Sequence, residues 1–237
     1  RTLKKGPLLP LRAYPAVGLA RGRIYVAAWR VPGRHRQWSP LSYRLGEVRT
    51  AAERWRHRFG GNRLVEHLSR CALEYRCLTA INLLLGRGEA GIPVSPTCNA
   101  ACAGCLSRQP TGGATAAQER LRFVPAVAEI VPLMVRHLQN APGAIVSFGQ
   151  GCEGEPLLQS GVLTAAIRAA RARTAKGTIN INTNGSRPEV LSALAAAGLD
   201  SVRVSLLSAR PEIYRAYHRP GDFDLADVAQ FLAAARR

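Results

Sequence analysis

The chain has 237 residues, of which 47% are hydrophobic and 20% are charged. This balance excludes a chain that is disordered throughout and allows a hydrophobic core. No apolar run approaches the roughly 18 residues of a membrane span, and no export signal follows Arg1, so we expect a cytoplasmic protein without a membrane partner.

The net charge of +18 is concentrated in residues 1–90, which carry 18 Lys and Arg against 5 Asp and Glu. Such a segment attracts polyanions, RNA above all. Three tryptophans and three clustered arginines would suit stacking on RNA bases: Trp29, Trp38, Trp55, Arg54, Arg56 and Arg58. A solvated helix face explains Arg54 and Arg58 more simply.

Residues 1–90 are predicted to form a small mixed α+β region. Tyr, Val and Ile alternate with Gly and Pro between Ala13 and Val31, which indicates short strands and turns. An apolar stripe at helical spacing runs from Leu64 to Leu78, after Asn62 as a candidate N-cap. Cys71 and Cys77 lie about 240° apart on such a helix, so we expect both to be buried structural cysteines.

Residues 91–237 alternate strand and helix patterns. Strands are expected over 91–97, 144–148, 178–182 and 201–205, and helices over 125–138, from Pro156, over 188–197 and over 224–235. Gly198 is placed to end the third of these helices in a left-handed conformation. The alternation predicts an α/β domain with a parallel sheet of about four βα units and right-handed crossovers.

Three cysteines lie close together where the first of these strands ends. Cys98, Cys102 and Cys105 would share one face of a helix, but Pro96 and Gly104 disfavour a helix there. In a chain without export signals this clustering suggests a metal or redox site. A structural zinc site takes four ligands, which three cysteines do not supply unless Cys152 joins them. Three thiolates on a [4Fe–4S] cluster would leave one iron open to another ligand.

After these cysteines come Gly154-Glu155-Pro156, which follow the second strand, and Thr183-Asn184-Gly185, which follow the third. With this order of motifs, residues 91–237 resemble the radical S-adenosylmethionine (radical SAM) superfamily. The resemblance implies a partial parallel (β/α) barrel. It also implies that Cys98, Cys102 and Cys105 hold a [4Fe–4S] cluster whose open iron binds S-adenosylmethionine. The expected activity is reductive cleavage of that cofactor to a 5′-deoxyadenosyl radical, which acts on an unknown substrate.

The resemblance also assigns cofactor contacts. The run Glu153-Gly154-Glu155 matches the stretch that lines the methionine end of S-adenosylmethionine, and Asn182, Thr183 and Ser205 fall where members contact ribose or carboxylate. An electron donor such as flavodoxin or ferredoxin is the implied partner, with RNA a possible substrate.

The chain departs from the family pattern in several places. Ala103 and Gly104 stand where members commonly carry an aromatic residue, so the adenine contact has to come from elsewhere. Glu153 replaces a glycine, and Leu207 stands where many relatives carry Asp. The family usually builds six βα units, so we expect a fragment, inactive by itself, of an active longer protein.

Other interpretations remain open from the residues alone. Gly149-Gln-Gly-Cys-Glu-Gly154 also satisfies the G-x-G-x-x-G dinucleotide fingerprint. That fingerprint requires a carboxylate after the next strand, and Asn182-Thr183-Asn184 supplies none. Cys152 is either a packing residue or a thiol that faces the cofactor. A radical SAM enzyme that modifies RNA through the basic region, and a non-enzymatic zinc or iron–sulfur module that binds nucleic acid, are the alternative functions.

Overall fold

A computed structural model describes residues 16–27, 43–109 and 116–236. It begins with an antiparallel hairpin of β1 (Ala16–Ala20) and β2 (Arg23–Ala27). Gly22, at φ +70°, lies in the turn and adopts a left-handed backbone conformation that glycine tolerates. The expected strands between Ala13 and Val31 are therefore confirmed where the structure describes them.

Three helices follow, namely α1 (Leu45–Arg58), α2 (Arg63–Leu73) and α3 (Leu78–Leu85). The predicted N-cap is confirmed, because Asn62 Oδ1 accepts hydrogen bonds from the backbone N–H groups of Leu64 and Val65. The prediction of one helix from Asn62 to Leu78 is wrong. The chain turns between α2 and α3 with Arg76 at φ +57°, and Cys77 becomes the N-cap of α3.

A four-stranded parallel sheet forms the centre, in the order β3 (Glu89–Gly91), β4 (Ile145–Phe148), β5 (Thr178–Thr183) and β6 (Ser201–Val204). The first strand ends earlier than predicted, since only Ile92 N–H continues the pairing, to Ser147 O. The other three strands lie where the sequence places them. The prediction of a partial parallel α/β barrel is confirmed.

Five helices follow β3 in the described part of the chain; the first three connect successive strands of the sheet, and the last two follow β6. They are α4 (Val127–Asn140), α5 (Ser160–Arg171), α6 (Leu191–Ala197), α7 (Pro211–His218) and α8 (Leu225–Ala234), with short 3-10 turns η2 (Pro156–Gln159) and η3 (Pro188–Val190). Gly198 ends α6 in the left-handed conformation, at φ +106°, as predicted. Helix α7 is not among the helices expected from the sequence.

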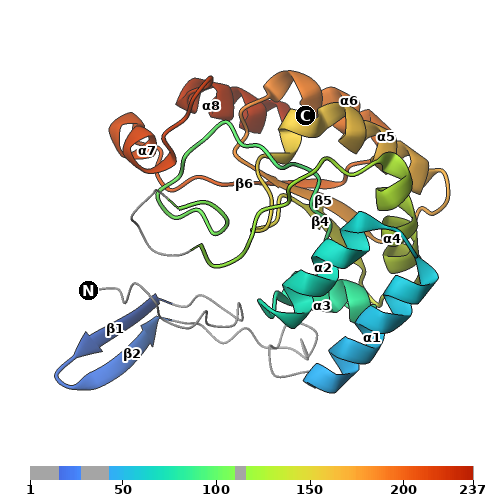
Figure 1. The fold of residues 1–237 in the computed structure, drawn as a ribbon. Helices are drawn as coiled ribbons and strands as arrows, with labels where there is room; N and C mark the ends of the chain where they lie inside the picture. The colour runs from blue at the N-terminus through green and yellow to red at the C-terminus, as the bar shows by residue number, and fades with distance from the viewer. Residues whose placement is uncertain (1–15, 28–42, 110–115, 237) are drawn as a thin grey trace.

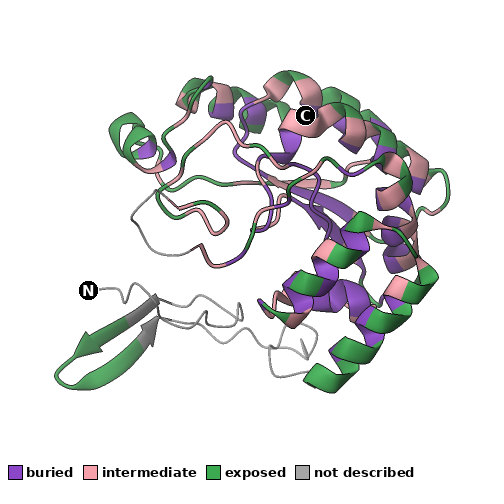
Figure 2. Ribbon diagram, viewed as in Figure 1, coloured by how far each residue is buried: buried purple, intermediate pink, exposed green. Residues whose placement is uncertain are grey.

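Figure 1 shows α4, α5, α6 and α8 as an outer arc, with the sheet inside it and the loops at the strand ends enclosed by the arc. Apolar side chains of β4 and β5 are fully buried, among them Val146, Phe148, Ile179 and Ile181. Figure 2 shows the same burial on the inward sides of the helices. Helices α1 to α3 contribute to this core through residues such as Val48, Leu64 and Ile81. The division of the chain at residues 90 and 91 stays a prediction.

None of the helices in the described ranges is long and apolar enough to cross a membrane.

Asn62 joins two helices as well as capping one, because its Nδ2 donates to Glu129 O in α4. We expect Asn62→Ala to lower the free energy of unfolding by about 1–2 kcal/mol, since two N–H groups of α2 lose their acceptor. Urea unfolding measures the change. Asn140→Ala, at the exposed end of α4, is the control, and an equal loss in both variants would contradict the assignment.

Candidate functional site

A cavity of about 250 Å³ lies where β4, β5 and β6 end and collects all the residues that the sequence predicted for the site. They are Cys98, Cys102, Cys105, Glu153, Gly154, Glu155, Asn182, Thr183 and Ser205. The carboxyl ends of parallel strands are the usual place for ligands in such folds. Residues as far apart in the sequence as Cys98 and His218 therefore meet around one hollow.

The cysteine-bearing segment is an irregular loop, as Pro96 and Gly104 predicted. The end of α7 holds this loop in place: Ala101 N–H donates to His218 O, and Ala103 N–H donates to Tyr217 O at 2.9 Å. Within the loop, Cys105 N–H donates to Cys102 O at 3.2 Å. All six cysteines of the chain lie in the described part and are free thiols.

The three thiols of this loop affect one another electrostatically. Burial, together with the charges of Cys98 and Cys105, raises the pKa of Cys102 to about 11. Burial also raises the pKa of Cys98. Burial acts in the same direction on Cys105, but hydrogen bonds from the Ser107 N–H and hydroxyl and from the Arg108 N–H lower its pKa overall. A cation bound among the three sulfur atoms would favour their thiolate forms and oppose the effect of burial.

Two side chains that the sequence analysis did not assign contact these sulfur atoms. His218 Nδ1 lies 3.4 Å from Cys102 Sγ. His218 Nε2 accepts a hydrogen bond from Leu207 N–H, so the proton resides on Nδ1 and is donated to the sulfur. Burial lowers the pKa of His218 and favours this neutral form. Arg120 Nη2 lies 3.3 Å from Cys105 Sγ.

Glu155 connects the start of η2 to the end of β5. Its Oε1 accepts hydrogen bonds from Thr183 Oγ1 at 2.6 Å and from Leu157 N–H at 3.0 Å, and its Oε2 accepts one from Asn184 N–H at 2.8 Å. Burial raises the pKa of this carboxyl. Asn182 Nδ2 donates to Phe148 O at 3.1 Å, so β4 and β5 are also joined where the cavity begins.

Glu153 holds backbone segments together. Its Oε1 accepts from the N–H groups of Gly149 and Gln150, and its Oε2 accepts from those of Val94 and Ser95, at 2.6–3.1 Å. Burial raises the pKa of Glu153 to about 7, although these four bonds favour the charged form. Glu153 stands where the family pattern has a glycine, and its carboxylate thus holds the loop in place through hydrogen bonds from the backbone.

Glycine is required at two positions of this loop. A Cβ on Gly154 would lie 1.8 Å from Thr97 O, and one on Gly149 would lie 1.7 Å from Asn182 O. The first close approach accompanies two hydrogen bonds between the segments, Gly154 N–H to Ser95 O at 2.7 Å and Glu155 N–H to Thr97 O at 2.8 Å. Gly149 and Gly154 are therefore needed where two chain segments cross closely beside the cavity. The strand that follows ends without the carboxylate that the dinucleotide fingerprint requires.

The cysteine loop has no aromatic residue of its own, but an aromatic side chain from α7 lies beside it. Tyr217 of α7 lines the cavity, and a Cβ on Gly104 would lie 2.3 Å from its hydroxyl oxygen. The missing side chain at Gly104 thus leaves room for Tyr217. Cys152, by contrast, is not among the described residues that line this cavity, and its thiol lies beside Cys71 and His67.

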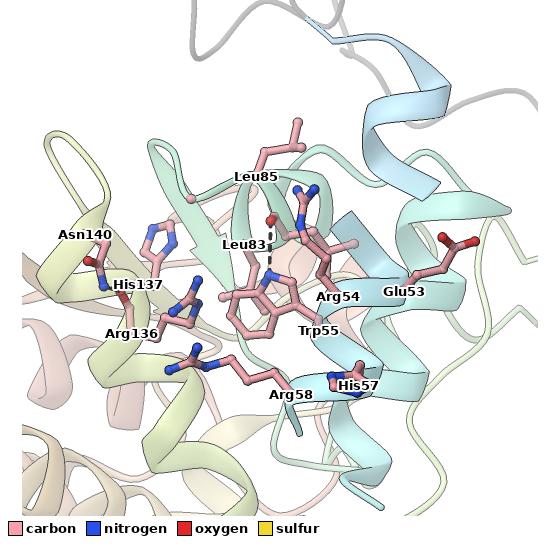
Figure 3. Close-up of a pocket in the computed structure, with 12 residues that line it drawn as sticks. Glu53, Arg54, Trp55, His57, Arg58, Leu83, Leu85, Arg136, His137 and Asn140 are labelled. Atoms are coloured by element: carbon pink, nitrogen blue, oxygen red, sulfur yellow. Dashed lines mark hydrogen bonds between the residues drawn. The ribbon is translucent and has the colours of Figure 1, made fainter. Parts of the chain in front are cut away.

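A second cavity of about 770 Å³ lies between α1, α3 and α4 and carries several basic groups (Figure 3). Arg58 and Arg136 extend into it from facing helices, and Trp55 Nε1 donates to Leu84 O at 3.0 Å behind them. Burial, together with the charge of Arg58, lowers the pKa of Arg136. Trp29 and Trp38 lie outside the described residues, so the RNA-binding hypothesis stays a prediction.

We expect Gly154→Ala to displace the cysteine loop, because its methyl group would overlap the backbone of Thr97. The free energy of unfolding should fall by more than about 2 kcal/mol in urea unfolding. Gly161→Ala is the control, since Gly161 lies in α5 with no atom within 4 Å of an added Cβ. That control should be neutral or stabilising, and a Gly154→Ala variant that behaves like it would refute the close crossing.

Comparison with known proteins agrees with this geometry. The Radical SAM superfamily matches residues 92–237, which is more than half of the chain. A GTP 3′,8-cyclase from Heliobacterium modesticaldum (strain ATCC 51547 / Ice1) is 42% identical over 74 residues, which cover 30% of this chain and 22% of that relative. The chain thus spans about a fifth of the relative's length. Members of the superfamily bind a [4Fe–4S] cluster and S-adenosylmethionine. From the extent of the family match, this chain belongs to the radical SAM superfamily.

Proposed function

We propose that Cys98, Cys102 and Cys105 hold a [4Fe–4S] cluster and that S-adenosylmethionine binds beside it in the same cavity. The observation that carries the proposal is the meeting of three free thiols with the ends of β5 and β6 around one hollow. Membership of the superfamily supports an enzyme over a non-enzymatic nucleic-acid module.

The residues present fit such a cluster. Thiolates are the usual ligands of iron–sulfur clusters, and the loop offers three of them without a further cysteine along the cavity wall described by the structure. A bound cluster would supply one electron for reductive cleavage of the sulfonium, which starts a radical reaction on the substrate. Its open coordination position suits the amino and carboxylate groups of S-adenosylmethionine.

Two side chains would tune the sulfur ligands. His218 holds its proton on Nδ1 and donates it to Cys102, and Arg120 donates to Cys105. Hydrogen bonds to cysteine sulfur atoms are among the factors that set the potential of an iron–sulfur cluster. We therefore infer that His218 and Arg120 adjust electron transfer without being ligands themselves.

The polar groups along the cavity wall would orient S-adenosylmethionine. Ser205 lines the cavity where β6 ends, and Asn182 and Thr183 line it where β5 ends, although Thr183 Oγ1 already donates to Glu155 and Asn182 Nδ2 already donates to Phe148 O. The backbone at Gly154 lies open to the cavity, while the carboxylates of Glu153 and Glu155 are already engaged inside the protein. We infer that these two glutamates position the wall rather than contact the cofactor through their carboxylates.

The full reaction needs further components. A one-electron donor of the flavodoxin or ferredoxin kind is the proposed partner. The proposed compartment is the cytoplasm, where thiols remain reduced. RNA is a proposed substrate, and the charges of Arg58 and Arg136 around a common cavity near the starts of the strands would attract its phosphate groups away from the cysteine loop.

We expect the 237-residue chain, reconstituted anaerobically with iron and sulfide, to take up about four of each per chain and to absorb visible light through thiolate-to-iron charge transfer. Cys98→Ser, Cys102→Ser and Cys105→Ser should each lose this absorption. Cys77→Ser is the matched control and should retain it, because Cys77 caps α3 away from this cavity. A chain that takes up no iron, or an equal loss in the control, would overturn the proposal.

Tyr217 is the proposed aromatic contact for the adenine ring. With the cluster loaded, we expect Tyr217→Ala to raise the Kd for S-adenosylmethionine roughly 3- to 10-fold, which corresponds to the loss of one aromatic contact. Tyr217→Phe should bind as the parent does. Tyr25→Ala, on the exposed surface of β2, is the control in an equilibrium binding assay. Unchanged affinity in Tyr217→Ala would remove the tyrosine from the site.

A further inference from the structure

A group of three soft ligand atoms lies outside the proposed cluster site, where α2 packs against the loop that follows β4. His67 and Cys71 are four residues apart on α2 and share one helix face. His67 Nε2 and Cys71 Sγ are 3.6 Å apart. Cys152 Sγ completes the group, and all three ligand atoms lie within 4.8 Å of one another.

These separations are compatible with a single tetrahedral ion. Zn–S bonds of about 2.3 Å and Zn–N bonds of about 2.0–2.1 Å place nitrogen and sulfur ligands about 3.6 Å apart, and two sulfur ligands about 3.8 Å apart. The observed distance between His67 and Cys71 equals the first value. A cluster of several iron atoms would need a wider spacing of its ligands.

The chemistry of the set selects zinc. Two thiolates and one imidazole are soft and borderline ligands, which suit Zn²⁺ and exclude Mg²⁺ and Ca²⁺. Two thiolates neutralise the charge of the ion, so the bound centre would be electrically neutral and could be buried without a large desolvation cost. Cys71 and Cys152 are 1% and 2% exposed, whereas His67 is only half-buried and leaves a route of entry from solvent.

The two buried thiols are coupled to each other. A hydrogen bond from Cys152, and to a lesser extent the His67 contact, lowers the pKa of Cys71 to about 6. The same pairing, together with burial, raises the pKa of Cys152, so the pair shares one proton that a cation would displace.

We propose that His67, Cys71 and Cys152 form a second metal site, which binds one Zn²⁺ and joins helix α2 to the loop of residues 149–155. Cys77 lies outside the set, since its thiol contacts Thr79 Oγ1 at 3.4 Å and it is absent from the group of mutually close ligand atoms. The fourth coordination position is left for water or another small ligand. The proposal does not depend on the function proposed for the three-cysteine loop.

The test uses the full chain with Cys98, Cys102 and Cys105 changed to Ala, so that the other cysteine site cannot bind metal. Under anaerobic, reducing conditions we expect this variant to bind one Zn²⁺ per chain in competition with a chromophoric chelator. Co²⁺ in place of Zn²⁺ should give thiolate-to-cobalt charge transfer and the intense visible bands of tetrahedral coordination.

Adding Cys71→Ser or Cys152→Ser should lower the Zn²⁺ affinity at least roughly a hundredfold, and adding His67→Ala should lower it roughly tenfold or more. Cys77→Ser is the matched control and should leave the affinity within about twofold. Thermal unfolding separates binding from folding: Zn²⁺ should raise the Tm of the three-alanine variant but not that of its Cys71→Ser derivative.

Three results would overturn the inference: no Zn²⁺ binding by the three-alanine variant, an affinity that Cys71→Ser and Cys152→Ser leave unchanged, or an equal loss in Cys77→Ser. A disulfide between Cys71 and Cys152 in the anaerobically purified chain would overturn it as well, because the same sulfur atoms would then be occupied.

Discussion

The backbone contact between residues 94–97 and residues 149–155 is the constraint on which the candidate site depends. Two main-chain hydrogen bonds join the segments, and the Glu153 carboxylate adds two more bonds across them and two within residues 149–155. The approach is so close that only glycine fits at Gly154. Because the cysteine loop begins at residue 98, its starting position and direction follow from this crossing.

The contact also explains how carboxylates are used here. Glu153 and Glu155 are both buried, yet neither is left without hydrogen-bond donors, so charge-assisted bonds to N–H and hydroxyl groups offset part of their desolvation. One joins the exit of β3 to the end of β4, and the other joins η2 to the end of β5. Side chains that the family resemblance assigned to cofactor binding therefore serve to align three strand ends.

Much of this arrangement could be predicted from local sequence patterns. Hydrophobic periodicity located β4, β5, β6 and most of the helices that follow them, and the spacing of Cys98, Cys102 and Cys105 marked the site. The break between α2 and α3 could not be predicted, because the left-handed residue there is Arg76, where a glycine would have signalled it. For α7 a signal existed: Pro211 stands at its first turn, and the helix is only eight residues long.

Contacts between residues far apart in the sequence could not be predicted from local sequence patterns. His218 joins Cys102 across 116 positions, and Cys152 meets Cys71 across 81 positions, so no spacing rule connects them. Tyr217 shows the same limit in another form. In the sequence, Gly104 stands where members of the family carry an aromatic residue. In three dimensions, the absence of a side chain at Gly104 leaves room for the tyrosine of α7. Both cases depend on tertiary packing, which periodicity does not encode.

The dense bonding of residues 149–155 has a consequence for how the protein can vary in length. Inserting or deleting one residue there would shift every N–H donor past its acceptor, so this loop should keep its length in any working version of the chain. The turn at Pro142–Gly143 is the opposite case, exposed and with open space around Gly143. A peptide tag or fluorescent label spliced in at that turn would leave the sulfur-rich interior undisturbed.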